Sequence, residues 1–116
     1  MGALPNATVL EAYRAMTPGS AAMADRAKAL LPSGLAHDSR QFDPYPIYVQ
    51  RAVGPAKWDV DGNRYVDYFG GHGALLLGHN RPEVVAAVQE ALSRGTHFGA
   101  CHELELRWAE AILRMV

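Results

Sequence analysis

Three side chains that could bind a transition metal lie close together in the sequence: His97, Cys101 and His102. The zinc-protease pattern needs a second histidine four residues after the first, and Leu106 occupies that position after His102. Cys101 is the single cysteine, so the cysteine pairs of structural zinc sites are missing as well. We therefore expect no metal site. A small metal-binding domain built on these three residues is kept as a minor alternative.

A single arginine, Arg40, lies beside Phe42 in a stretch that has no hydropathy periodicity. A guanidinium group can hold a carboxylate through two parallel hydrogen bonds. An isolated arginine in a loop is also a common surface residue that contacts only solvent. From the residues alone, both interpretations stay open.

His72 lies in a glycine-rich segment at residues 70–73. This segment matches neither the dinucleotide-binding fingerprint nor the phosphate-binding P-loop, since no Gly-Lys-Ser/Thr follows it. We interpret it as a mobile crossover between a sheet and a helix. The alternative is a close approach of its backbone to a ligand, which glycine permits.

The composition is that of an ordinary globular chain. Its 116 residues are 49% hydrophobic and 20% charged, with a formal net charge of -1. This charge gives no electrostatic reason to bind nucleic acid or anionic membranes. No apolar run approaches the roughly 20 residues that cross a bilayer, and the first basic residue, Arg14, comes too late for a secretory signal. We expect one compact cytoplasmic unit with no nucleic-acid or membrane partner.

The elements that must position these residues begin with two helices. Helical spacing predicts the first over residues 7–16, and Ser20 is expected to cap the second. The apolar stripe of the second helix would consist of Met23, Ala27, Leu30 and Leu31. Pro32 and the two residues after it would end this helix, and an extended loop would follow over residues 34–46.

Three short β-rich segments predict an antiparallel meander after this loop. They cover residues 47–49, 57–60 and 64–69. An Asp-Gly pair at residues 61–62 marks a tight turn between the last two. The carboxylates Asp59 and Asp61 flank this turn, which predicts a structural role in the turn and not acid–base catalysis.

Two amphipathic helices are expected after the meander. Arg81-Pro82 begins the first, and Gly95 ends it. The second runs from Glu103 to Val116, and no capping residue follows its pattern. From this pattern we expect the chain to be the beginning of a longer protein.

Two stretches carry a family resemblance: Trp58–Tyr68 (WDVDGNRYVDY) and Leu77–Val84 (LGHNRPEV). They resemble the N-terminal part of class III aminotransferases, which depend on pyridoxal phosphate. Further short matches resemble the glutamate-1-semialdehyde 2,1-aminomutase branch of that family. They are Leu31–Gly34, Arg40 with Phe42, Pro46-Ile47, Gly95–Ala100 and Glu103–Glu105. Their common order and spacing make the resemblance specific from about Lys28 to the end of the chain.

The resemblance implies a type I pyridoxal-phosphate fold, α/β overall and α+β within this chain, and a homodimer. It implies an N-terminal helical segment (1–33), an extended substrate-side loop (34–46), a small-domain meander with its helix (47–95) and the start of the large cofactor-binding domain (96–116). The Schiff-base lysine, the phosphate loop and the aspartate facing the pyridine nitrogen would lie beyond Val116. No residue of this chain is therefore assigned to catalysis or to the cofactor.

The resemblance also implies two substrate-binding residues, Arg40 and His72. Arg40 falls where aminomutase-like proteins hold the substrate carboxylate. His72 replaces a tryptophan of the aminomutase pattern, which favours a related transaminase of ω- or β-amino acids. We expect an N-terminal fragment, inactive alone, of an aminotransferase or aminomutase acting on an amino acid or amino-aldehyde carboxylate. The alternative is a stand-alone, non-catalytic truncated paralogue that binds a full-length partner.

Overall fold

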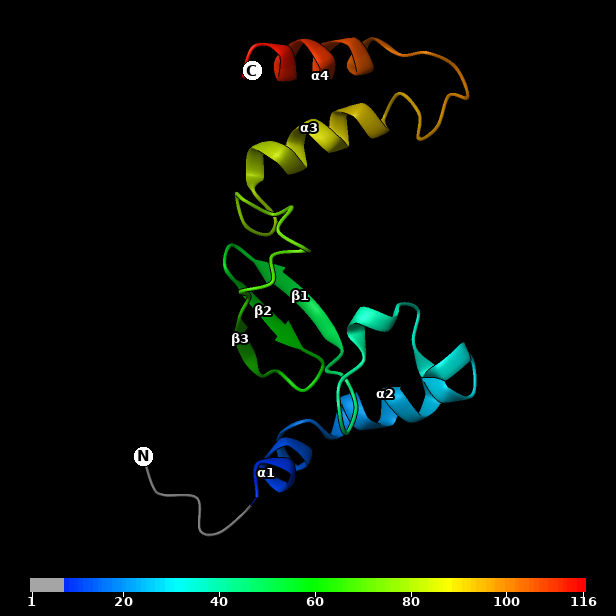
Figure 1. The fold of residues 1–116 in the computed structure, drawn as a ribbon, viewed down its shortest axis with the longest axis vertical. Coiled ribbons are helices and arrows are strands. Elements are labelled where there is room, and N and C mark those ends of the chain that lie inside the picture. Colours follow the sequence, from blue (N-terminus) through cyan, green and yellow to red (C-terminus); the bar gives the residue numbers. More distant parts are fainter. Residues whose placement is uncertain (1–7) are drawn as a thin grey trace. The chain divides into compact units, whose positions relative to one another are not determined.

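The computed structural model describes residues 8–116, and the chain divides into two compact units after Arg81 (Figure 1). The first unit holds two helices, a long loop and a three-stranded sheet, and the second holds two helices. The predicted α+β content of this chain is therefore confirmed. No helix within residues 8–116 combines the length and the hydropathy that crossing a bilayer requires.

Helix α1 (Val9–Met16) begins at a capping box. The Thr8 hydroxyl accepts from the backbone N–H of Glu11, and the Glu11 carboxylate accepts from the Thr8 N–H at 2.6 Å. These two bonds satisfy backbone donors that the first turn leaves free. The helix predicted over residues 7–16 is confirmed from Val9 onward, and residue 7 lies outside the described part of the chain.

Helix α2 (Pro18–Lys28) begins two residues before the predicted cap, so the assignment of Ser20 as its cap is wrong. Asp61, in the turn between two strands of the sheet, caps the helix instead. Its carboxylate accepts from the N–H groups of Gly19 at 2.6 Å and Ser20 at 3.0 Å. A carboxylate at this end also interacts favourably with the positive end of the helix dipole. One long-range side chain thus ties the helix to the turn between two strands.

The predicted apolar stripe of α2 is mostly wrong. The buried residues of this helix are Ser20, Ala24 and Ala27, whereas Met23 and Leu30 are exposed. The small buried side chains let the chain after the long loop approach closely, and the Tyr48 N–H donates to the Ser20 hydroxyl at 3.1 Å. Close backbone approach therefore replaces the packing of large side chains on this face.

The sheet is the predicted antiparallel meander, in the order β1-β2-β3. Its strands are β1 (Val49–Val53), β2 (Ala56–Asp59) and β3 (Arg64–Val66). Lys57 pairs with Ala52 on one side and with Tyr65 on the other. The third strand ends three residues earlier than predicted, because the Asp67 carboxylate accepts the N–H groups of Phe69 and Gly70 and bends the chain away.

The turn between β2 and β3 is organised by Asp59, whose side chain is fully buried. One carboxylate oxygen accepts from the N–H groups of Asp61 and Asn63, and the other accepts from the Asn63 amide and the Tyr65 hydroxyl. Burial would raise the pKa of this carboxyl, but these hydrogen bonds lower it below its ordinary value. The predicted turn role of Asp59 is confirmed.

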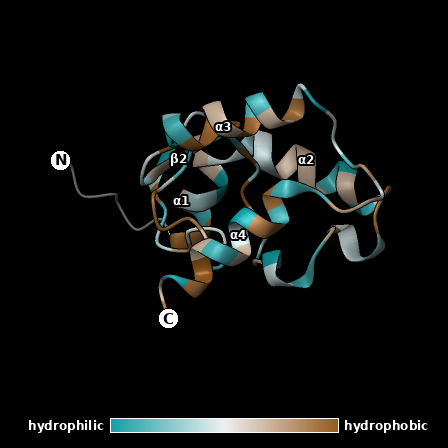
Figure 2. Ribbon diagram, turned by 90° about the horizontal axis from the view of Figure 1, so that it is seen from above, coloured by the Kyte–Doolittle hydropathy of each residue, from teal (hydrophilic) through white to brown (hydrophobic). Residues whose placement is uncertain are grey.

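The second unit consists of α3 (Pro82–Leu92) and α4 (Glu103–Leu113). Both predicted helices are present, but α4 ends at Leu113, three residues before the predicted end at Val116. Helix α4 carries hydrophobic and hydrophilic residues along its length (Figure 2). The apolar side chains of both helices remain largely exposed within the described chain, and Trp108 is 69% exposed. This unit therefore presents apolar faces that its own residues do not cover.

Candidate functional site

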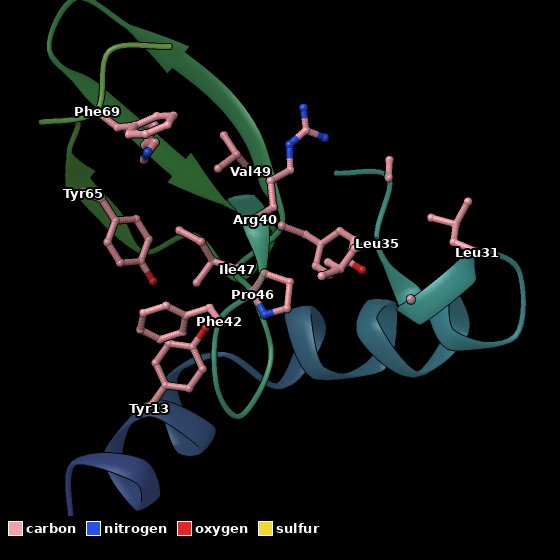
Figure 3. Close-up of a pocket in the computed structure, with 14 residues that line it drawn as sticks. Tyr13, Leu31, Leu35, Arg40, Phe42, Pro46, Ile47, Val49, Tyr65 and Phe69 are labelled. Carbon is pink, nitrogen blue, oxygen red and sulfur yellow. The ribbon is translucent and has the colours of Figure 1, made fainter. Parts of the chain in front are cut away.

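The first unit contains a cavity of about 710 Å³. It is lined by α1, the loop over residues 34–46 and one face of the sheet (Figure 3). Five aromatic residues and several aliphatic side chains form most of the wall, and two basic side chains contribute to it. The aromatic residues are Tyr13, Phe42, Tyr48, Tyr65 and Phe69, and the basic residues are Arg40 and Lys57. No carboxylate of the described residues lines this cavity. The arrangement suits an apolar ligand that carries negative charge.

Arg40 closes a short helical turn, Asp38–Arg40, in the long loop. His37 begins this turn: its ring Nδ1 accepts from the Ser39 N–H at 3.2 Å, and its carbonyl accepts from the Arg40 N–H at 3.0 Å. The Arg40 guanidinium makes no hydrogen bond or ion pair with any residue between 8 and 116. Figure 3 shows it extending away from the Tyr13 ring. No described residue therefore competes with a ligand for its donors.

The aromatic wall holds two tyrosines whose hydroxyl groups are already used. Tyr13 donates to the Tyr45 carbonyl at 2.7 Å, and Tyr65 donates to Asp59 at 2.7 Å. Burial is the main cause that raises the pKa of Tyr13, and the nearby Tyr45 and Asp59 raise it further. The pKa of Tyr65 is raised by burial and then by Asp59. Both phenols therefore stay protonated near neutral pH. They offer ring surface to the cavity and no general base.

Lys57 lines the cavity, but its charge is already paired. Its Nζ lies 3.0 Å from Asp67, and the His79 Nε2 lies 2.6 Å from the other oxygen of that carboxylate. The hydrogen bond from His79, followed by that from Lys57, holds the pKa of Asp67 well below its usual range against the effect of burial. Asp67 is therefore ionised at neutral pH and neutralises Lys57.

His79 reaches Asp67 because the chain doubles back onto the sheet edge. Gly54 and His79 exchange two backbone hydrogen bonds of 2.8 and 2.9 Å. A Cβ atom on Gly78 would lie 2.9 Å from the Gly54 carbonyl oxygen, and φ at Gly78 is +76°. Both observations call for glycine at this position, since a side chain would clash and strain the backbone.

His72 does not line the cavity itself. Its ring meets the Phe69 ring edge-on, with 4.4 Å between centroids, and Phe69 does line the cavity. The His37 ring lies 6.2 Å from His72 on another side. Of the two predicted substrate residues, the structure places Arg40 in the wall and His72 in contact with Phe69, a residue of the wall.

Sequence reasoning did not identify Lys57, Asp67 and His79 as a cluster. Strand alternation could have indicated the orientation of Lys57, because side chains along a strand point alternately to opposite faces. Lys57 and Asp59 must therefore share one face of β2, and Trp58 must lie on the other. The structure agrees with this alternation, since Trp58 stacks under Arg51, whose guanidinium carbon is 3.6 Å from the ring centroid. The partner of Lys57, ten residues further along, had no comparable signal.

One of the three possible metal ligands, His102, has a structural role at the second unit's last helix. His102 caps α4, with its Nδ1 accepting from the Leu104 N–H at 3.1 Å. The Phe98 ring stacks on His102 at 4.9 Å. Within residues 8–116, no three side chains of His, Cys, Asp or Glu are arranged to hold a metal ion.

The sequence has clear relatives. The family described as "Aminotransferase class-III" matches residues 37–116. A glutamate-1-semialdehyde 2,1-aminomutase of Rhodopirellula baltica is 44% identical over 102 residues, which are 85% of this chain and 23% of the relative. One from Methanothrix thermoacetophila is 44% identical over 94 residues, which are 81% of this chain and 22% of the relative. This chain thus spans less than a quarter of the length of these relatives.

Solved structures agree with these relatives. A β-phenylalanine aminotransferase from Variovorax paradoxus matches with a TM-score of 0.83 and 29% identity, over 89% of this chain and 24% of its own. A glutamate-1-semialdehyde aminomutase from Pseudomonas aeruginosa matches with a TM-score of 0.78 and 27% identity, over 88% of this chain and 23% of its own. The fold and the sequence give the same answer: the chain belongs to the class-III aminotransferase family and corresponds to the N-terminal portion of its members.

Proposed function

We propose that this chain is the N-terminal part of a pyridoxal-phosphate-dependent aminotransferase or aminomutase, and that Arg40 binds the carboxylate of its substrate. The unpaired guanidinium of Arg40 at an apolar cavity carries this proposal. An aromatic and aliphatic wall would exclude water from the bound carboxylate and strengthen its bonds to the guanidinium. Arg40 would then orient the substrate by its acid group.

Pyridoxal phosphate, when bound, would act as an electron sink for the carbon that bears the amine. The described residues do not fit the covalent attachment of this cofactor. Lys28 and Lys57 are the only lysines of the sequence, and each forms a 3.0 Å ion pair with an aspartate. The lysine that holds this cofactor must be free to react with its aldehyde, and each of these lysines is instead engaged with a carboxylate. The attachment site would therefore belong to residues outside this chain.

The remaining expectations are part of the same proposal. His72, in contact with Phe69, would shape the side-chain end of the substrate site through that ring. The relatives are named for an amino aldehyde and for an aromatic β-amino acid, and we propose a substrate of this general kind, an amino acid or amino-aldehyde carboxylate. A homodimer with residues 96–116 at the start of the large domain completes the proposed arrangement.

The proposal is tested on the protein encoded by the complete reading frame that contains this chain. The purified protein, supplied with pyridoxal phosphate, is incubated with carboxylate-bearing amino donors and with the matching amines that lack the carboxylate. We expect loss of the amino group from the carboxylate-bearing donors and little turnover of the simple amines. A protein that moves the amino group of neither kind of donor contradicts the proposed reaction, and equal turnover of both kinds contradicts the role of Arg40.

A further inference from the structure

The Asp67 cluster, which consists of Lys57, Asp67 and His79, connects the sheet to the chain that follows it. The Asp67 side chain is only 5% exposed, and both of its oxygens are occupied. One oxygen accepts from Lys57 at 3.0 Å and from the backbone N–H groups of Phe69 and Gly70, and the other faces the His79 ring at 2.6 Å. This carboxylate is fixed by four neighbours and is not free to leave Lys57.

Lys57 also belongs to the cavity wall that contains Arg40. Its side chain is 25% exposed, and its ammonium group is held by Asp67. Among residues 8–116, the wall therefore has two cations, and only the Arg40 guanidinium has donors without a partner. The other described residues of the wall are mainly aromatic and aliphatic, and none of them is cationic.

A ligand with two carboxylates would lose hydration from the second one without gaining a free cation in return. Burial of an unpaired charge is strongly unfavourable. A ligand with one carboxylate and an apolar body has no such cost, because its body replaces water against Tyr13, Phe42 and Phe69. The binding free energies of the two ligand classes therefore differ most through the group that each ligand places near Lys57.

We propose that Asp67 determines substrate specificity by holding the Lys57 ammonium, which restricts this site to ligands with one carboxylate and an apolar body. Asp67 acts through Lys57 and is a positioning residue, not a catalytic one. The inference rests on the proposed function in one respect, because it takes the Arg40 guanidinium as the group that binds the first carboxylate. It predicts that neutralising Asp67 opens the site to dicarboxylates.

The test uses two unreactive probes and the protein from the complete reading frame. The probes are 3-phenylpropanoate, with one carboxylate, and glutarate, with two, and their dissociation constants are measured by calorimetry. Asp67→Asn keeps the side-chain shape and an acceptor for Phe69 and Gly70, but it releases the Lys57 ammonium. We expect glutarate to bind about three- to thirtyfold more tightly, the range between a surface ion pair and a hydrogen bond to a charged group. Binding of 3-phenylpropanoate should be unchanged.

The chain offers a matched control. Asp25 forms a 3.0 Å pair with Lys28, both side chains are well exposed, and neither residue lines the cavity. Asp25→Asn changes the net charge by the same amount and frees a lysine elsewhere, so it should leave both dissociation constants unchanged. Adding Lys57→Met to Asp67→Asn should remove the gain for glutarate. A gain that survives Lys57→Met, or that appears equally in Asp25→Asn, overturns the proposal.

A third variant keeps the proposal testable if Asp67→Asn does not fold. Lys57→Met in the otherwise natural protein removes the paired ammonium and leaves the Asp67 carboxylate in place, so it should not strengthen glutarate binding. Tighter binding of glutarate in this variant would show that a free cation at position 57 is not what dicarboxylates lack, and it would overturn the inference. Arg40→Ala separates this inference from the proposed function. If the proposed function is right, Arg40→Ala must weaken the binding of both probes, whatever the Asp67 variants show.

Discussion

Replacement of Arg40 by alanine removes the one guanidinium at the cavity that has no partner among residues 8–116. Hydrogen bonds between charged groups contribute about 1.5–3 kcal/mol each. Because Arg40 is exposed in this chain, we take the loss of about one to two such bonds at the low end of that range. This corresponds to a loss of roughly ten- to 150-fold in kcat/KM for carboxylate-bearing donors. Cofactor binding should not change, because no described contact of Arg40 serves that purpose.

The assay compares kcat/KM for an amino acid and for its decarboxylated amine in the natural protein, Arg40→Ala and Arg40→Lys. Arg40→Lys should recover only part of the loss, since an ammonium cannot form the two parallel bonds of a guanidinium. Arg26→Ala serves as the control, because Arg26 is an exposed arginine of α2 outside the cavity wall. If Arg40→Ala leaves turnover of the amino acid unchanged, or reduces turnover of the simple amine equally, the carboxylate role is refuted.

Three further predictions follow from the same geometry. Asp59→Asn should lower the free energy of unfolding by about 1–3 kcal/mol, as a buried acceptor of four hydrogen bonds loses its charge, and thermal melts of full-length protein check this. The depressed pKa of Asp67 means that its stabilisation is complete above about pH 4 and is lost as pH falls further, so Asp67→Asn should flatten the acid limb of a stability–pH curve. An unchanged limb would contradict this. The 116-residue chain alone should be inactive, and treatment with pyridoxal phosphate and borohydride should leave no stoichiometric adduct on Lys28 or Lys57 in a mass spectrum.

Local signals predicted the meander and its turn well. Asp61-Gly62 between two β-rich segments gave the hairpin between β2 and β3, and the buried carboxylate of Asp59 holds that turn through partners within six residues. Such bonds depend on short sequence separations, so the residue types alone indicate them. The same holds for the capping box of Thr8 and Glu11, whose residues lie one turn apart.

Contacts between distant residues could not be predicted in the same way. Asp61 caps α2 across 41 and 42 residues, and this bond moved the start of that helix away from the predicted cap. In the site, Asp67 pairs with both Lys57 and His79, and the bridge between Gly54 and His79 brings His79 to this carboxylate. No local pattern encodes these pairings, because tertiary packing decides them.

The central claim is that Arg40 grips the substrate carboxylate, and a crystal structure of the full-length protein with 3-phenylpropanoate tests it most directly. The account predicts both carboxylate oxygens within hydrogen-bond distance of the Arg40 guanidinium, at about 2.7–2.9 Å, with the phenyl ring against Tyr13, Phe42 or Phe69. A carboxylate bound elsewhere in the active site, with the Arg40 guanidinium left in solvent, would contradict it.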